Sequence, residues 1–181
     1  MITIMSDYIR QLFTDGRRLT FSASEPVFHI GDPVRRMHLV VEGEVALTRQ
    51  TRAGASVRLQ QAGPGQVLAE ASAYAQAYHC DAASVAGAVI RSLPLAVFRA
   101  RLAEDVRAAE AWAAHLARAV QAARMRAELR TLRTVSERLD AWLGEAGALP
   151  EKGGWTHLAD ELGVTREALY RELARRRATS V

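Results

Sequence analysis

Short apolar runs, separated by turns that contain glycine or proline, dominate the chain between about residues 19 and 93. The runs cover residues 26–30, 38–42, 44–48, 57–59, 83–86 and 88–91. Gly43 separates two of them, and Gly31-Asp32-Pro33 and Gly63-Pro64-Gly65 supply further turns. Short, evenly spaced strands of this kind predict an antiparallel sandwich or barrel. Residues 2–15 carry apolar side chains at a helical spacing and predict a short leading helix.

A helical pattern begins at Pro94, because proline suits the first turn of a helix. Alanine, arginine, leucine and glutamate, which are good helix formers, fill the segment that follows. Apolar positions recur at spacings of three and four, at Val106, Ala109 or Ala113, Leu116, Val120, Ala123 and Ala127. The pattern predicts one long helix whose apolar seam can pair with a second helix as a coiled coil. The alternative is an amphipathic helix that lies on its own domain; we expect Trp112 to pack under the β region.

The C-terminal part of the chain predicts three short helices. Residues 134–143 form an apolar face at a helical spacing, and the glycine-containing residues 144–154 predict a loop. Residues 158–173 predict two helices around a tight turn, with Gly163 where a left-handed backbone suits glycine. Thr165 is a natural N-cap for the last helix. This is the layout of a helix-turn-helix, whose second helix enters the major groove of DNA.

Polar side chains gather on one side of that last helix. We predict DNA contacts from Thr165, Arg166, Glu167, Tyr170, Arg171 and Arg175. Residues four apart share a helix face, as Glu167 and Arg171 do. An arginine can donate two hydrogen bonds to a guanine edge, and a glutamate can accept one from the cytosine amino group. The alternative is an ordinary amphipathic helix pair with Glu–Arg ion pairs along one helix.

The charge of the chain is carried almost wholly by arginine. The formal net charge is +4, and Lys152 is the only lysine. Residues 165–181 hold five arginines and two acids. The run Arg175–Arg177 can meet DNA phosphates, or it can be a solvated end of the chain. The arginines of the long helix are predicted as a solvated face, at Arg118, Arg124, Arg126, Arg130 and Arg133.

Several classes of protein are disfavoured by what the sequence lacks. A single cysteine, Cys80, excludes a disulfide within the chain. No apolar run approaches membrane-spanning length and no signal segment opens the chain, so we expect a cytoplasmic protein with no membrane partner. The absence of a nucleophile–base arrangement, a phosphate-binding Gly-Lys loop and a metal-hydrolase motif argues against an enzyme.

The stretch Thr165-Arg166-Glu167, followed by Arg171, resembles the helix-turn-helix of the Crp/Fnr family of bacterial transcription regulators. The resemblance extends to residues 27–33, 39–45 and 63–68 of the β region, and in all it spans roughly residues 19–177. It implies an α+β fold in which an N-terminal antiparallel β-roll, or jelly roll, precedes a long dimerisation helix. A C-terminal helix-turn-helix domain without a full wing follows. The implied boundaries are 1–100 for the sensor domain, 101–133 for the helix and 134–181 for the DNA-binding domain.

The same resemblance implies a homodimer that binds a palindromic operator in double-stranded DNA, with RNA polymerase as a further partner. In the family, the residues that match Arg166 and Glu167 read base edges. The residue that matches Arg171 reaches a base or a phosphate. This chain departs from the family at Arg176, where a core leucine is common, and beyond it, where a two-stranded wing usually follows.

The resemblance also bears on the effector. In family members that bind cyclic AMP or GMP, a Phe-Gly-Glu stretch and a short helix precede an Arg-Ser or Arg-Thr pair. There the glycine lets backbone amides approach the phosphate, and the arginine neutralises the phosphate charge. The glutamate accepts a hydrogen bond from the ribose hydroxyl. The matching positions here are Leu68-Ala69-Glu70 and Asp81-Ala82. An acid at Asp81 would repel a phosphate, so we predict that no cyclic nucleotide binds and that the effector is unknown, small or lost.

The candidate effector pocket consists of Glu70, His79, Cys80, Asp81 and Ala82. Imidazole, thiolate and carboxylate are also metal and haem ligands. Adjacent residues point to opposite sides of a strand, however, so His79 and Cys80 cannot easily share one metal. We therefore predict no metal and no cofactor, with Cys80 as a small buried residue. The alternative function is a ligand-, metal- or haem-sensing module whose DNA binding is weak or lost.

Overall fold

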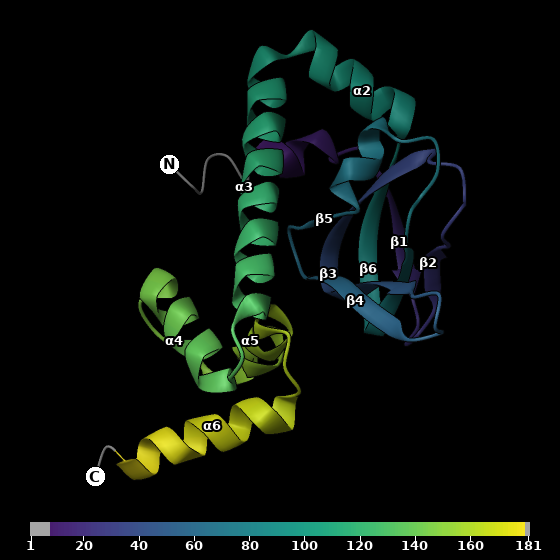
Figure 1. Cartoon of the computed structure of the whole chain (residues 1–181). Helices are drawn as coiled ribbons and strands as arrows, with labels where there is room; N and C mark the ends of the chain where they lie inside the picture. Colours follow the sequence, from purple (N-terminus) through teal and green to yellow (C-terminus); the bar gives the residue numbers. More distant parts are fainter. Residues whose placement is uncertain (1–7, 180–181) are drawn as a thin grey trace. The chain divides into compact units, whose positions relative to one another are not determined.

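The computed structural model describes residues 8–179, in which an antiparallel sheet is followed by helices, so the predicted α+β class is confirmed (Figure 1). The sheet elements are β1 (Arg17–Phe21), β2 (Pro26–Phe28), β3 (Arg36–Gln50), β4 (Ser56–Ala62), β5 (Val67–Leu68) and β6 (Asp81–Pro94), with the 3₁₀ helix η1 (Glu70–Tyr74). The helices are α2 (Leu95–Glu104), α3 (Val106–Thr131), α4 (Val135–Ala146), η2 (Lys152–Gly154), α5 (Trp155–Leu162) and α6 (Arg166–Thr179). The chain divides into two compact units, Met1–Ala117 and Arg118–Val181. The three-part division at 1–100, 101–133 and 134–181 stays a prediction.

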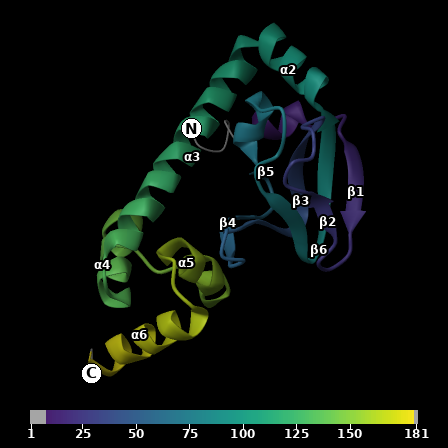
Figure 2. The ribbon, with the colours of Figure 1, turned by 45° about the vertical axis from the view of Figure 1, so that its right-hand side comes forward.

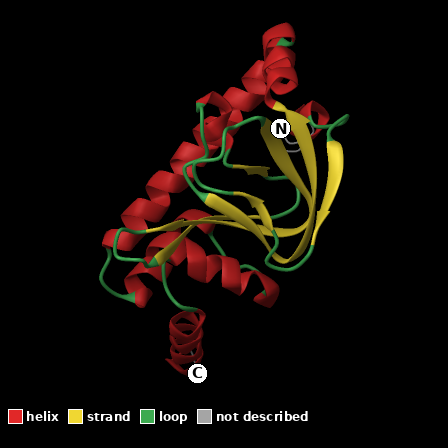
Figure 3. Cartoon of the chain, turned by 90° about the vertical axis from the view of Figure 1, so that its right-hand side faces the viewer, coloured by secondary structure: helices red, strands yellow, loops and turns green. Residues whose placement is uncertain are grey.

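Two long strands organise the sheet of the first unit. The strand order is β1-β6-β3-β4, with β2 also on β6 and β5 also on β3, and every pairing is antiparallel. β1 pairs with residues 88–92 of β6, whereas β2 pairs with residues 82–83. β6 therefore pairs with different strands along its length, and Figure 3 shows that long strands of the sheet are bent.

The bend lies where glycines of β3 and β6 meet. Gly43 has φ +74°, and a Cβ on it would lie 2.1 Å from the carbonyl oxygen of Gly87, so only glycine fits there. The register of β3 against β6 shifts on both sides of Gly43, which marks a β-bulge. The prediction of separate strands at 38–42 and 44–48, and at 83–86 and 88–91, is therefore wrong. A bulge, not a turn, interrupts each apolar run.

Two clusters of buried residues form the core of the first unit. One, among the strands, includes Val40, Val45 and Ile90, none of which is exposed. The other joins the sheet to helical residues, and in it the Trp112 and Phe98 rings meet edge to face at 4.9 Å. The expected packing of Trp112 under the β region is confirmed.

Helix boundaries differ from the prediction at two places in this unit. The single helix expected from Pro94 onward is wrong, because Asp105 has an extended backbone and separates α2 from α3. Figures 1 and 2 both show the chain turning between these helices. The Asp105 carboxylate accepts a hydrogen bond from the Arg107 amide at 2.9 Å, an arrangement that starts a helix and competes with its continuation. Residues 8–12 are helical, and the rest of the predicted leading helix before residue 8 lies outside the described residues.

The second unit contains the predicted helix pair. The Thr134 hydroxyl accepts from the Glu137 amide while the Glu137 carboxylate accepts from the Thr134 amide, which is a capping box at the start of α4. α4 runs to Ala146, so the loop predicted from residue 144 begins three residues too early. Gly163 lies in the left-handed region at φ +64°, and Thr165 accepts from the Ala168 amide at 3.2 Å, as predicted. Among residues 8–179, no helix is long and apolar enough to cross a membrane.

Candidate nucleic-acid interface and effector region

The face of α6 predicted to meet DNA is exposed. Leu169 and Leu173 are buried in the core of the second unit with Leu158 and Leu162 of α5. All six predicted DNA-contact residues, Thr165, Arg166, Glu167, Tyr170, Arg171 and Arg175, are exposed. The helix thus presents a polar side to the outside while its leucines attach it to α5.

The charges on this face remain available. Among the described residues, neither Arg166 nor Arg171 has a hydrogen bond or ion pair, so the Glu167–Arg171 ion pair of the alternative interpretation is not formed. Hydrogen bonds from its own backbone amide and from Thr165 lower the pKa of Glu167, which therefore stays ionised at neutral pH. Two free guanidiniums and a carboxylate on adjacent turns can supply donors and an acceptor to base edges.

Tyr170 is also part of the packing. Its ring meets the Trp155 ring edge to face at 5.3 Å, and the Arg177 guanidinium lies 5.3 Å from the Trp155 ring centroid. The Trp155 indole donates to the carbonyl oxygen of Pro150 at 3.0 Å. Tyr170 is 38% exposed, so it can contact a partner only with part of its ring. Its aromatic packing fixes the first turns of α6 against the start of α5.

Arg138 holds the helix-turn-helix turn in place, a role that the sequence did not reveal. From α4, its Nη1 donates to the carbonyl oxygens of Leu162 at 3.0 Å and Gly163 at 3.1 Å. Its Nε donates to the carbonyl of Leu132, just after the end of α3, at 3.0 Å. One cation thus satisfies carbonyls at two helix ends, where positive charge is favoured.

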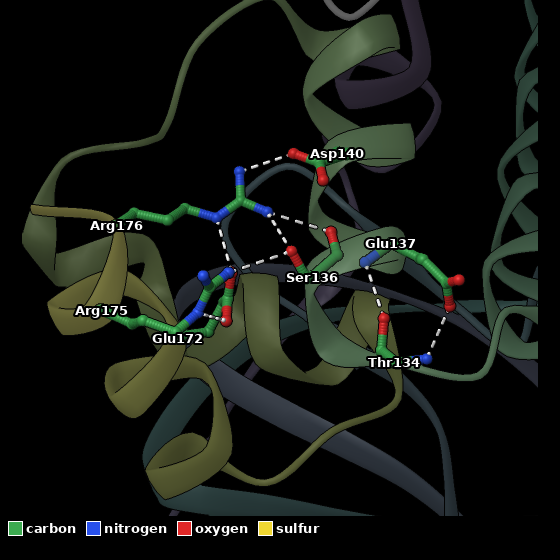
Figure 4. A network of polar contacts seen from close by, with 7 residues as sticks. All are labelled: Thr134, Ser136, Glu137, Asp140, Glu172, Arg175 and Arg176. Carbon is green, nitrogen blue, oxygen red and sulfur yellow. Dashed lines mark hydrogen bonds and ion pairs between the residues drawn. The ribbon is translucent and has the colours of Figure 1, made fainter. Parts of the chain in front are cut away.

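An ionic network joins α6 to α4 (Figure 4). Arg176 donates to Glu172 at 2.7 Å, to Asp140 at 2.6 Å, and to the hydroxyl and carbonyl oxygens of Ser136 at 3.0 Å each. Arg175 donates twice to Glu172, at 2.7 and 3.0 Å. The hydrogen bond from Arg175, together with those from Arg176 and Ser136, lowers the pKa of Glu172 to about 2. Arg176 therefore connects α6 to α4 through polar contacts.

The five predicted effector residues differ in burial and do not all face the same side of the sheet. Cys80 and Ala82 are buried in the core of the sheet, whereas His79 is exposed. The Asp81 carboxylate accepts from the Ile30 amide at 3.0 Å and lies 3.4 Å from His29 Nδ1. Asp81 thus anchors the loop after β2. His79 and Cys80 lie in a bend just before β6, with His79 exposed and Cys80 buried.

The backbone at Ala69 keeps the conformation that glycine favours. Its φ and ψ are 46° and 50°, in the left-handed region, although the residue carries a buried methyl group. Glu70 directly follows as the half-buried first residue of η1, the short helix that the family resemblance implied. Ala69 therefore holds a backbone conformation that a glycine would adopt at lower cost.

The chemistry of Cys80 is that of a buried thiol. Burial raises its pKa, and the nearby Asp81 and Glu70 carboxylates raise it further. A thiol with a raised pKa is a weak nucleophile and a weak metal ligand at neutral pH. Within residues 8–179 there is no group of three or more His, Cys, Asp or Glu side chains that could hold a metal ion.

A cavity of about 610 Å³ lies elsewhere in the first unit. It is lined by Arg10, Gln11, Thr14, Leu39, Val40, Val41, Pro64, Gly65 and Arg91. None of the five predicted effector residues is among them. Arg91 donates to the carbonyl oxygens of Phe13 and Thr14, so this side chain is already engaged in holding the N-terminal helical turn.

His38 makes the first unit sensitive to acid. It is buried, its Nδ1 has no partner among the described residues, and burial, with a smaller contribution from Arg36, lowers its pKa from 6.5 to about 4. Because its pKa is lower in the folded state, the histidine of the unfolded chain takes up a proton first as the pH falls. The free energy of unfolding is therefore highest above the pKa of the unfolded state and decreases as the pH falls toward the pKa of the folded state. We expect His38 to lower the free energy of unfolding by about 3 kcal/mol between pH 7 and pH 4.

Denaturant unfolding at both pH values, on the wild type and on His38→Leu, measures this contribution. As the pH falls, the carboxylates of the two proteins gain protons to the same extent, so the difference between the two pH dependences belongs to His38. Parallel curves of stability against pH for the two proteins would contradict the assignment.

Comparison with known proteins identifies the fold. Residues 18–105 match the family model of the cyclic nucleotide-binding domain. The chain is similar to FixK2 from Bradyrhizobium japonicum, at 19% identity and a TM-score of 0.71, over 92% of this chain and 86% of that one. It is similar to the c-di-GMP-responsive global regulator CLP from Xanthomonas campestris, at 18% identity and a TM-score of 0.66, over 97% and 93%.

A third similar structure is the catabolite activator protein of Thermus thermophilus, at 22% identity and a TM-score of 0.57, over 97% of this chain and 84% of that one. No curated protein sequence matches the chain. Residues 18–105 are thus similar to cyclic nucleotide-binding domains, and nearly the whole chain has a fold like that of the Crp/Fnr-family regulators. The resemblance inferred from the sequence is confirmed at the level of the fold.

Proposed function

We propose that this chain, which has the fold of the Crp/Fnr regulators, is a sequence-specific DNA-binding transcription regulator. The observation that carries the proposal is the exposed face of α6, on which Arg166, Glu167 and Arg171 stand without competing ion pairs within the described residues. Arg166 is the candidate for a bidentate contact to a guanine edge, and Glu167 for an acceptor of a cytosine amino group. Arg171 is one turn further along and reaches a base or a phosphate.

The protein acts as a homodimer through α3 in this proposal. Apolar and small residues recur with a heptad period along the helix, at Val106, Ala113, Val120 and Ala127 and at Ala109, Leu116 and Ala123. Val106 is 73% exposed and Val120 is 50% exposed in the single chain. A seam of this kind is stabilised when a second copy of the same helix covers it. Two recognition helices related by a two-fold axis would then meet half-sites about 34 Å apart.

The N-terminal unit is the proposed sensor, for an effector other than a cyclic nucleotide. A cyclic nucleotide would bring its phosphate to a position that holds Asp81, whose carboxylate already accepts from the Ile30 amide. Cys80 and Ala82 fill the interior beside it. The similarity to cyclic nucleotide-binding domains supports a sensor role. The negative charge of Asp81 argues against a cyclic nucleotide as the effector.

Arg166→Ala tests base readout. We expect it to cost about 1–3 kcal/mol of binding free energy on the preferred operator and to relax base preference at one position in each half-site. Fluorescence anisotropy on operators with every base at each position measures both effects. The matched control is Arg52→Ala, which removes the same charge at the exposed turn between β3 and β4 and should leave base preference intact. Equal weakening on all DNA sequences would show that Arg166 reads no base.

A further inference from the structure

Arg176 is fully engaged in joining α6 to α4. Its three guanidinium nitrogens donate to Glu172, Asp140 and Ser136, and its side chain is only 28% exposed. Two of these partners lie on α4, whereas Glu172 lies one turn earlier on α6. Arg176 therefore fixes the rotation of α6 about its own axis, and hence the direction in which Arg166 and Arg171 project.

Arg175 has a different environment, although it is adjacent. Its side chain is 60% exposed, and the hydrogen bonds described for it go to Glu172, with a longer one of 3.3 Å to the Ser136 hydroxyl. Glu172 is 9% exposed and receives both arginines (Figure 4). If Arg175 leaves, the buried Glu172 carboxylate still has Arg176 as its partner. Releasing Arg175 thus removes one of two cationic partners and does not leave the Glu172 carboxylate without compensation.

We propose that Glu172 sets the affinity of α6 for the DNA backbone by competing with phosphate for the Arg175 guanidinium. On DNA, Arg175 exchanges the Glu172 carboxylate for a phosphate, while Arg176 keeps Glu172 compensated and holds α6 in place. This inference rests on the proposed DNA binding and names the residue that limits it. Glu172 is an affinity-setting residue that itself touches no DNA.

The experiment is a double-mutant cycle on the full chain. Binding to a random-sequence 30-base-pair duplex is measured by fluorescence anisotropy across a range of salt concentrations, for the wild type, Glu172→Gln, Arg175→Gln and the double variant. Glu172→Gln should bind roughly two- to fivefold more tightly, because the carboxylate that competes with phosphate for Arg175 is replaced by a neutral amide. The dependence of log affinity on log salt should steepen by about 0.9, the value for one additional phosphate contact.

Asp140→Asn is the matched control, because Asp140 is an acid of the same network and its ion pair in the structure is with Arg176. Removing its charge should change the affinity less than Glu172→Gln does. Circular dichroism and thermal unfolding of each variant show that α6 is intact, and a variant that unfolds is replaced by Glu172→Met in the same cycle.

The outcomes separate the two proposals. If Glu172→Gln no longer raises the DNA affinity when Arg175 is also replaced by glutamine, the result supports the exchange. An equal gain in that background, or an equal gain from Asp140→Asn, shows a general charge effect and overturns the inference while DNA binding stands. Failure of the wild type to bind the duplex at low salt overturns the inference and the proposed function together.

Discussion

Gly43→Ala is expected to lower the free energy of unfolding of the N-terminal unit by about 3–6 kcal/mol. Two costs add at this position. The backbone has φ +74°, which disfavours any residue with a Cβ, and the new methyl group would lie 2.1 Å from the Gly87 carbonyl oxygen. Since that oxygen belongs to the backbone of the neighbouring strand, β3 and β6 would have to separate at the bend. Chemical denaturation followed by tryptophan fluorescence and circular dichroism measures the loss.

Gly54→Ala is the matched control. Gly54 has nearly the same backbone, at φ +80°, but nothing lies within 4 Å of the position its Cβ would take. This variant should lose only about 1–2 kcal/mol, the cost of a left-handed alanine. The difference between the two variants isolates the contact between β3 and β6. Similar losses for both would mean that the bend of the two strands does not depend on their close approach at Gly43.

Val120→Glu is expected to convert the proposed dimer to a monomer. Val120 occupies a central position of the α3 seam, and in a parallel pair the two glutamates would face each other in an apolar interface. Burying two like charges without partners costs several kcal/mol, so the dimer dissociation constant should rise by about 100-fold or more. Because Val120 is 50% exposed in the single chain, the fold of the monomer should be unaffected.

The control for this variant is Gln121→Glu, which adds the same charge at the next residue, off the seam. Sedimentation velocity across a range of protein concentrations should give a dimer for the wild type and Gln121→Glu, and a monomer for Val120→Glu. The substitution Val120→Glu should then weaken binding to a palindromic operator far more than it weakens binding to a single half-site. An unchanged sedimentation coefficient for Val120→Glu would show that the copies do not meet along this seam.

Local signals made the helix-turn-helix predictable. Gly163 and Thr165 act on their own neighbours in sequence, through a left-handed turn and an N-cap, so the residue types alone specify the structure. Both residues act on backbone groups that lie only a few positions away in the sequence.

Interactions between distant segments were not predictable in this way. Gly43 separates apolar runs as a turn residue would, and only the approach of Gly87 on β6 shows that it forms a bulge. Arg138 and Arg176 look like solvated charges on amphipathic helices, since their acceptors are carbonyls and carboxylates of other elements. The end of α2 at Asp105 was hidden because apolar residues continue at a helical spacing on both sides of it.

Selection of bound fragments from a pool of random double-stranded DNA tests the central claim most directly. If two copies of α6 read DNA about a two-fold axis, the enriched sequences contain an inverted repeat whose half-site centres lie about 10 base pairs apart. Arg166→Ala should then lose selectivity at one symmetric pair of positions. Recovery of fragments without any shared inverted repeat, or no enrichment over the starting pool, would contradict the account.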